Sequence, residues 1–194
     1  MFHLTKPSQA DIDRFLDSLQ SDTFSYPHIG ATHDSARPDG YVVDHNRQLL
    51  GSGSETFECA KQAVRQWKMF DVPGLKLIRD DTPIEPGRNV ALVANHLGFW
   101  SVSSCRIVYV IDEPDLFGFA YGTLSQHAES GEERFTVEYH AGTGEVWYDI
   151  YAFSRPGHWI VRLGYPYARN LQTSFAVASK AAMVSAVISI NSVR

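Results

Sequence analysis

The chain has 194 residues, 44% of them hydrophobic, and a formal net charge of −5 at pH 7. This length and composition predict a single globular domain, residues 1–194, with a substantial core. No stripe of Lys and Arg runs through the sequence, which argues against a nucleic-acid partner. The N-terminus lacks a basic-then-apolar signal pattern, and the apolar run Ala181–Ile190 is too short to span a bilayer.

The two cysteines, Cys59 and Cys105, do not form a C-x-x-C pair. A reduced, cytoplasmic chain is the simpler interpretation, and a single disulfide is the alternative. Gly51-Ser52-Gly53 stands between a predicted strand and a predicted helix, where a phosphate loop would lie. The dinucleotide fingerprint needs a third glycine, but that position holds Thr56. No cofactor is therefore expected.

The first forty residues are expected to form a helix and a covering loop. Ser8 and Asp11 suit a helix start, because a serine cap is followed three residues later by an acid. The helix then presents one apolar face, formed by Ile12, Phe15, Leu16 and Leu19. Residues 21–40 are broken by His, Pro and Gly, and their expected place is across the sheet.

The next segment is expected to alternate strand and helix. Tyr41 begins a strand that runs to about Leu50. Ser52 and Glu55 have the spacing of a capping box, for a helix that reaches about Phe70. Two short strands follow, Leu75–Ile78 and Asn89–Ala94.

The centre of the chain is typical of four consecutive antiparallel strands separated by turn residues. They are Arg106–Ile111, Phe117–Leu124, Glu133–Tyr139 and Val146–Phe153. If Tyr139 pairs with Val146, alternation puts Glu133 and Tyr148 on one face. Simple closure of the other two turns adds a second group to that face, Arg106, Gly118, Ala120 and Gly122. The opposite face then carries Phe119, Tyr121 and a pairing of Arg134 with Asp149, unless a β-bulge exchanges the two faces.

Beyond Pro156 the chain is expected to become helical, from about Tyr165 to Met183. An apolar stripe predicts the side of this helix that packs on the sheet, and it consists of Leu171, Phe175, Ala178 and Ala182. The β-branched tail 184–194 is a weaker helix former. The single domain thus divides into an extension (1–40), a core (41–183) and a tail (184–194).

This order of elements resembles the helix-grip fold of the START (SRPBCC) and pollen-allergen superfamily, an α+β architecture. There a curved antiparallel sheet wraps the last helix, and a cavity lies between them. The local sequence resembles a narrower group, uncharacterised protein family 0548, for which no activity is assigned. The matching stretches are Tyr26–Thr32, Gly51–Gly53, Trp67–Phe70, Cys105–Val110, Phe117–Leu124, Gly131–Phe135 and Trp147–Ile150. The resemblance therefore implies a fold and a cavity, and no reaction.

No metal is expected. His127, Glu132 and Glu133 lie together on one predicted loop and form the metal-binding alternative, but solvated loops commonly collect such residues. His127-Ala128-Glu129 has the H-x-E pattern of zinc deaminases without its P-C-x-x-C partner. A nucleophilic triad has no motif either, since G-x-S-x-G is missing.

We expect a protein that binds a small apolar or acidic-apolar molecule in a cavity between the sheet and the C-terminal helix. The candidate ligand contacts are Arg106, Glu133, Tyr148, Trp100 and Phe175. An enzyme of the same fold, of cyclase, hydratase or hydrolase type, is one alternative; its candidate acid–base groups are Glu133, Tyr148 and His96. A structural or interaction protein with a filled core is the other. The oligomeric state stays open.

Arg106 carries the sharpest of these expectations. It begins an otherwise apolar strand, and the simple register places it opposite Gly122 on the inward face. An arginine keeps its charge when it is buried and offers a planar fork to a carboxylate. Arg106 is therefore expected either to pair with Glu133 or to anchor an acidic ligand.

Overall fold

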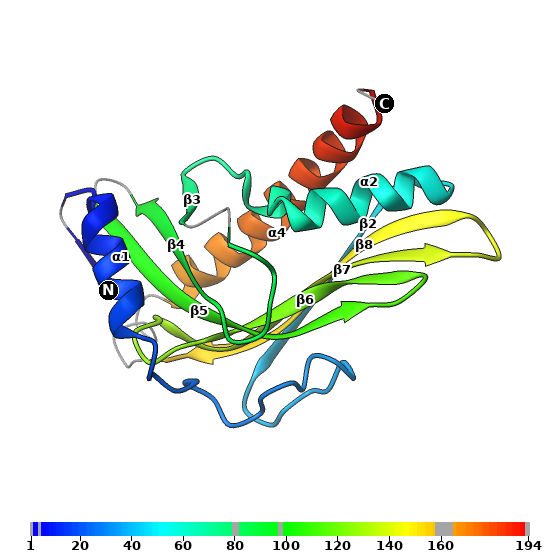
Figure 1. Cartoon of the computed structure of the whole chain (residues 1–194). Helices are drawn as coiled ribbons and strands as arrows, with labels where there is room; N and C mark the ends of the chain where they lie inside the picture. Colours follow the sequence, from blue (N-terminus) through cyan, green and yellow to red (C-terminus); the bar gives the residue numbers. More distant parts are fainter. Residues whose placement is uncertain (1, 4, 79–81, 97–98, 158–164, 193–194) are drawn as a thin grey trace.

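The computed structural model describes residues 2–3, 5–78, 82–96, 99–157 and 165–192. A curled antiparallel sheet forms its centre, with two long helices on one face and an N-terminal loop on the other (Figure 1). We call the face toward the helices the inner face and the face toward residues 20–41 the outer face. This is the helix-grip architecture that the sequence predicts.

The described strands form one sheet in the order β2-β8-β7-β6-β5-β4-β3, and the short β1 pairs with β5. The strands are β1 (Phe2–His3), β2 (Val42–Ser52), β3 (Leu75–Ile78), β4 (Asn89–His96), β5 (Phe99–Asp112), β6 (Leu116–Thr123), β7 (Glu129–His140) and β8 (Glu145–Pro156). The helices are α1 (Gln9–Ser18), α2 (Ser54–Arg65), the 3-10 turn η1 (Lys68–Phe70) and α4 (Tyr165–Ser192).

Of the two predicted helix N-caps, one is confirmed and the other is wrong. Helix α1 begins with the predicted capping box, in which the Ser8 side chain accepts from the Asp11 amide and Asp11 bonds back. Helix α2 has Gly53 as its N-cap without a side-chain hydrogen bond, so the predicted cap at Ser52 is wrong. Its end also differs, because Trp67 adopts a left-handed backbone conformation (φ 56°) that cannot continue an α-helix.

Helix α4 is longer than the sequence predicts, because it continues through the β-branched tail to Ser192. Met183 and Val187 are buried in the same core as α2, and this packing outweighs the low helix propensity of the tail. The predicted stripe is rotated: Leu171 is 38% exposed, and the side chains that α4 buries are Ala176, Ser179, Met183 and Val187.

The segment Arg169–Ser192 is long and apolar enough to cross a membrane by length and composition, with a mean hydropathy of 1.5 and 22% of its apolar window buried. A core helix of a globular protein can have the same length and composition. In this fold α4 packs against α2, η1 and the sheet (Figure 1). We therefore describe it as a helix of the domain.

The register of the sheet confirms one predicted pairing and overturns another. Tyr139 pairs with Val146, as expected. Tyr121 pairs with Glu133, however, so these two side chains share the inner face. Strand β6 is therefore turned over relative to the prediction, and its Gly/Ala row, Gly118, Ala120 and Gly122, belongs to the outer face. A bulge in β5 between Ile107 and Tyr109 shifts the faces again along that strand.

The N-terminal loop covers the outer face as expected, and Glu132 fixes it there. The carboxylate of Glu132 accepts hydrogen bonds from Tyr26 Oη (2.6 Å), Gly30 N (2.7 Å) and Thr32 N (3.0 Å). The predicted pair of Arg134 and Asp149 is present on the same face, at 3.2 Å. Buried polar groups are normally hydrogen-bonded, and loss of one partner from such a pair is costly, so these contacts account for the attachment of the loop to the outer face.

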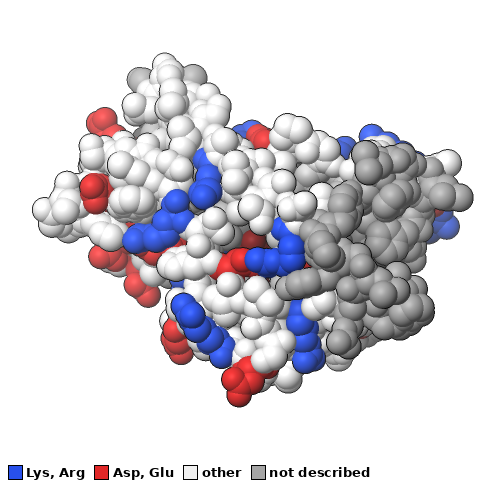
Figure 2. All heavy atoms as spheres, turned by 180° about the vertical axis from the view of Figure 1, so that it is seen from behind, with Lys and Arg blue, Asp and Glu red and all other residues white. Residues whose placement is uncertain are grey.

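Two further expectations concern the cysteines and the surface charge. Cys59 and Cys105 are both free and buried, which confirms the reduced interpretation over the disulfide. Acidic and basic side chains are interspersed in small groups over the described part of the face in Figure 2, without a continuous basic field.

Candidate functional site

The candidate site lies on the inner face where β6 and β7 pass under α4. Tyr121 of β6 and Glu133 of β7 are register partners, and Tyr121 Oη donates a hydrogen bond to Glu133 Oε2 at 2.8 Å. Antiparallel neighbours on one face have closely spaced Cβ atoms, so the pairing alone brings a phenol and a carboxylate together. This pair is the polar centre of an otherwise aromatic wall.

The electrostatic environment of Glu133 is unusual for a carboxyl group. Its pKa is raised from the ordinary value of 4.5 to about 7, mainly by burial and also by the negative charges of Glu129 and Asp44, against the lowering effect of the Tyr121 hydrogen bond. Its side chain is nevertheless partly accessible. Among the described residues, the bond from Tyr121 is its one hydrogen bond, and it makes no ion pair. A second oxygen of Glu133 is thus available to another molecule.

Aromatic rings cluster around Tyr121, the residue that donates to this carboxyl group. Phe70 of η1 stacks on Tyr121 at 6.1 Å between ring centroids, and it meets Phe135 at 5.4 Å. Phe175 of α4 stacks on Phe70 at 5.7 Å. Rings from the sheet, the turn and the helix therefore meet beside Glu133, and each is large and apolar with a negative π-face.

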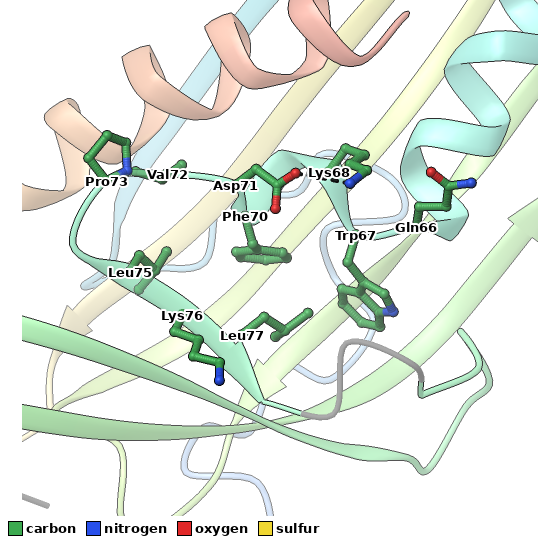
Figure 3. A pocket seen from close by; sticks show the side chains of 10 residues that line it. All are labelled: Gln66, Trp67, Lys68, Phe70, Asp71, Val72, Pro73, Leu75, Lys76 and Leu77. Carbon is green, nitrogen blue, oxygen red and sulfur yellow. Dashed lines mark hydrogen bonds and ion pairs between the residues drawn. The ribbon is translucent and has the colours of Figure 1, made fainter. Parts of the chain in front are cut away.

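A hollow of about 420 Å³ lies next to this aromatic group, under the turn between α2 and β3 (Figure 3). Phe70 of η1 and Leu77 of β3 line it, with Phe70 above Leu77 in this view, and Trp67 lies beside them. Because the ring of Phe70 lines the hollow and also contacts Tyr121, this one side chain borders both the hollow and the site.

The wall of β8 and α4 is closed by a buried hydroxyl pair. Tyr148 Oη and Ser179 Oγ are 2.9 Å apart, and burial raises the pKa of Tyr148 well above its ordinary value. Cys105 of β5 is also fully buried near the site, and burial together with the charges of Glu133 and Glu129 raises the pKa of its thiol. Both groups are therefore neutral at pH 7 and contribute bulk and polarity, without a charge.

The edge of the site toward β2 is acidic. Glu129 accepts a hydrogen bond from Gln172 Nε2 at 2.7 Å, and burial raises its pKa. Asp44 is held by Arg169 of α4, whose two terminal nitrogens reach its two oxygens at 2.5 and 2.7 Å. The described charged groups of this region are thus three carboxyl groups, Glu133 included, and one arginine, which is paired with Asp44.

Two of the predicted site residues belong to this group and one borders it. Glu133 and Tyr148 point inward from neighbouring strands, as expected, and Phe175 contacts the aromatic rings from α4. Tyr148 is bonded to Ser179, which fixes it as part of the wall.

The other predicted residues lie elsewhere. Arg106 is on the outer face, where its guanidinium donates to the backbone oxygens of Leu19 (2.6 Å) and Asp22 (2.7 Å) and to Asn89 Oδ1 (2.8 Å). Its predicted roles as the partner of Glu133 or the anchor of an acidic ligand are therefore wrong. It holds the end of α1 and the following loop to the sheet, because free carbonyls at a helix end need donors.

Trp100 is also on the outer side, where it packs with α1, so it does not line the site. The backbone of His96 ends β4, and its side chain lies outside the described part of the structure. The metal alternative of His127, Glu132 and Glu133 is wrong in geometry, because Glu132 bonds the outer loop and Glu133 bonds inner-face Tyr121. Alternation along β7 forces these neighbours to opposite faces.

Sequence reasoning missed Tyr121, Phe70, Glu129 and Gln172. The error for Tyr121 follows from the reversed face of β6. Phe70 had been assigned to the end of a helix, and the left-handed Trp67 that turns it into the site has no sequence signal. Gln172 and Glu129 come together only through the docking of α4, a contact across 43 residues.

The comparisons with known proteins agree with this architecture. A family model described as "Domain of unknown function (DUF1990)" matches residues 25–182. A UPF0548 protein of Dictyostelium discoideum is 36% identical over 214 aligned residues, covering 100% of this chain and 99% of its own. A UPF0548 protein of Arabidopsis thaliana is 37% identical over 155 residues, covering 77% of this chain and 75% of its own.

One solved structure is similar over nearly the whole chain. It is the di-domain ARO/CYC StfQ from the steffimycin biosynthetic pathway, with a TM-score of 0.51 and 11% identity. The match covers 97% of this chain and 63% of that one. At this level of identity the similarity shows the helix-grip fold and leaves the chemistry of the site to be argued from its residues.

Proposed function

The chain belongs to the UPF0548 family, and we propose that it binds a small, largely apolar molecule between the sheet and α4. The observation that carries this proposal is Glu133, a partly buried carboxyl group whose one hydrogen bond among the described residues engages only Oε2. A charge withdrawn from water without a partner destabilises the fold. A ligand that bonds to Glu133 would offset that cost.

The surroundings of Glu133 support an apolar skeleton for the ligand. The rings of Phe70, Phe135 and Phe175 offer apolar contact area, and Glu133 offers a polar group to fix the orientation of the ligand. Binding sites of this kind combine a mostly apolar lining with a few polar groups that fix orientation. We also propose a cytoplasmic location, because two buried free thiols suit a reducing compartment.

The test uses N-phenyl-1-naphthylamine, an uncharged apolar dye whose fluorescence rises on binding. We expect wild-type protein to bind it, and Phe175→Ala to weaken binding by about tenfold, roughly 1.4 kcal/mol, through the lost ring contacts. Val177→Ala is the matched control, because Val177 is on the same helix but 60% exposed. Equal weakening by both variants would place the dye on the outside of α4 and contradict the proposal.

A second candidate is acid–base catalysis on the bound molecule, and the pKa of Glu133 favours it. A carboxyl group with a pKa of about 7 can both accept and donate a proton at neutral pH. Native mass spectrometry of protein purified with its bound molecule tests this idea. A change in the mass of the ligand with time in the wild type, and its loss in Glu133→Gln, would establish turnover; an unchanged ligand in both would leave a binding protein.

A further inference from the structure

We propose that the polar group of the ligand is a cation, an amine or quaternary ammonium on an apolar skeleton, whose charge lies against Glu133. This inference rests on the proposed binding function and narrows the class of ligand. It follows from the sign of the charges around the site and from the rings that enclose it, taken together.

The described groups that face Glu133 from each surrounding element are acidic or neutral. Its own strand β7 contributes Glu129, and β2 contributes Asp44. Strands β5, β6 and β8 contribute three neutral groups, Cys105, Tyr121 and Tyr148. A ligand carboxylate brought to this place would meet the same sign of charge, so the acidic ligand expected from the sequence does not fit.

Arg169 and Lys68, cations on the two elements that bring Phe175 and Phe70 to the site, already have partners. Arg169 of α4 uses two nitrogens on the two oxygens of Asp44, and Lys68 of η1 lies 3.1 Å from Asp71. The pair of Arg169 with Asp44 is bidentate, a strong and directional geometry, and the contact of Lys68 with Asp71 is a single one. Neither of these cations bonds to Glu133, so its charge is left for a cation of the ligand to compensate.

The aromatic rings favour the same kind of ligand. The ring of Phe70 stacks on Tyr121 and on Phe175, with an angle of 25° between the ring planes in each pair. The ring of Phe135 is nearly perpendicular to that of Phe175, at 88°. An ammonium group is attracted to the negative face of such rings, most strongly where water is excluded. An alcohol could bond to Glu133, but it would neither compensate the charge nor gain from the rings.

Binding of a cation should then be coupled to the loss of a proton. With a pKa of about 7, Glu133 is roughly half protonated in the free protein at pH 7. A cation selects the ionised form, so about half a proton is released per ligand bound at that pH. Affinity should rise by up to about tenfold per pH unit as pH increases toward 7, and level off above it.

Isothermal titration calorimetry of the full chain tests the inference with three eight-carbon probes: octyltrimethylammonium, 1-octanol and octanoate. The quaternary probe carries a permanent charge, so that any pH dependence comes from the protein. Titrations in phosphate and in Tris at pH 7 report the protons released. We expect the ammonium probe to bind at least about tenfold more tightly than the other two, with proton release.

Two variants separate a specific role of Glu133 from a structural one. Glu133→Gln keeps the shape of the side chain and should abolish both the proton release and the pH dependence. Tyr121→Phe removes the hydrogen bond that lowers the pKa of Glu133, so the midpoint of the pH profile should move to higher pH. An unmoved midpoint, or proton release that persists in Glu133→Gln, would overturn the inference.

The outcomes also separate this inference from the proposed function. If octanol or octanoate binds as tightly as the ammonium probe, and Phe175→Ala weakens that binding, the apolar site stands and the cation inference fails. If none of the three probes binds, both fail. Preference for the ammonium probe with release of about half a proton at pH 7 supports both.

Discussion

Replacement of Glu133 by glutamine should stabilise the protein, and the gain should depend on pH. Glu133→Gln keeps an oxygen to accept the bond from Tyr121 Oη and removes the charge. The folded-state pKa of about 7 is above the ordinary value of 4.5, so the folded protein holds this proton more tightly than the unfolded chain. The stability that this proton contributes is present below pH 4.5 and is lost as pH rises toward 7.

The size of the effect follows from the size of the pKa difference. A rise from 4.5 to about 7 corresponds to about 3 kcal/mol, and the partial accessibility of Glu133 lowers the expected value to about 2 kcal/mol. For a chain of this length, that is about 4–8 °C in Tm. Thermal melts of both proteins from pH 5 to pH 8, without ligand, should therefore diverge as pH rises.

A matched control isolates the buried charge. Glu113→Gln removes a carboxylate from an exposed turn and should give a difference in Tm that stays flat with pH. If Glu133→Gln also gave a flat difference, or were less stable than the wild type at pH 8, Glu133 would have a compensating partner. The argument that an external molecule compensates it would then fail.

Two further predictions concern the outer face. Gly122→Ala should lower the free energy of unfolding in urea by about 2–4 kcal/mol, because its new Cβ would lie 2.0 Å from Tyr26 Oη and displace a donor to Glu132. Gly142→Ala is the control and should be nearly neutral, because a Cβ there would meet nothing within 4 Å. Equal effects of the two substitutions would show that Tyr26 does not fill the space above Gly122. Removal of residues 1–40 should make the protein aggregate or bind a hydrophobic dye, because it removes the hydrogen-bond donors to Glu132 and exposes the rings beneath the loop. A truncated protein that stays dispersed and melts cooperatively at the wild-type temperature would contradict this prediction.

The sequence predicted the fold because the fold depends on local patterns. The alternation that pairs Tyr139 with Val146 and the cap at Ser8 each involve residues within a few positions of one another. The order of strands and helices then leaves few ways to build a curved sheet around a last helix. These features needed no knowledge of distant contacts.

The site could be predicted only in part, because the register between β6 and β7 decides which side chains of β6 are on the inner face. Gly122 pairs with Glu132 across the β6–β7 connection, and a closure that is one residue different exchanges every side chain of β6 between the faces. That choice moved Tyr121 away from Glu133 and brought Arg106 toward it. The register found places Gly122 under Tyr26, which fills the space above it from a loop almost 100 positions away in the chain, a contact that the sequence does not reveal.

The contrast between Glu132 and Glu133 carries the functional argument. The two residues are adjacent and chemically identical, and alternation sends them to opposite faces of β7. Glu132 is 3% exposed and receives bonds from Tyr26 Oη, two loop amides and Thr32 Oγ1, which together account for the strong tether of the N-terminal loop. Glu133 receives one bond in the described chain and remains partly accessible among aromatic rings. Since the same strand satisfies one carboxylate fully and leaves its neighbour unsatisfied, the deficit at Glu133 is specific to the inner face, where a ligand between the sheet and α4 would meet it.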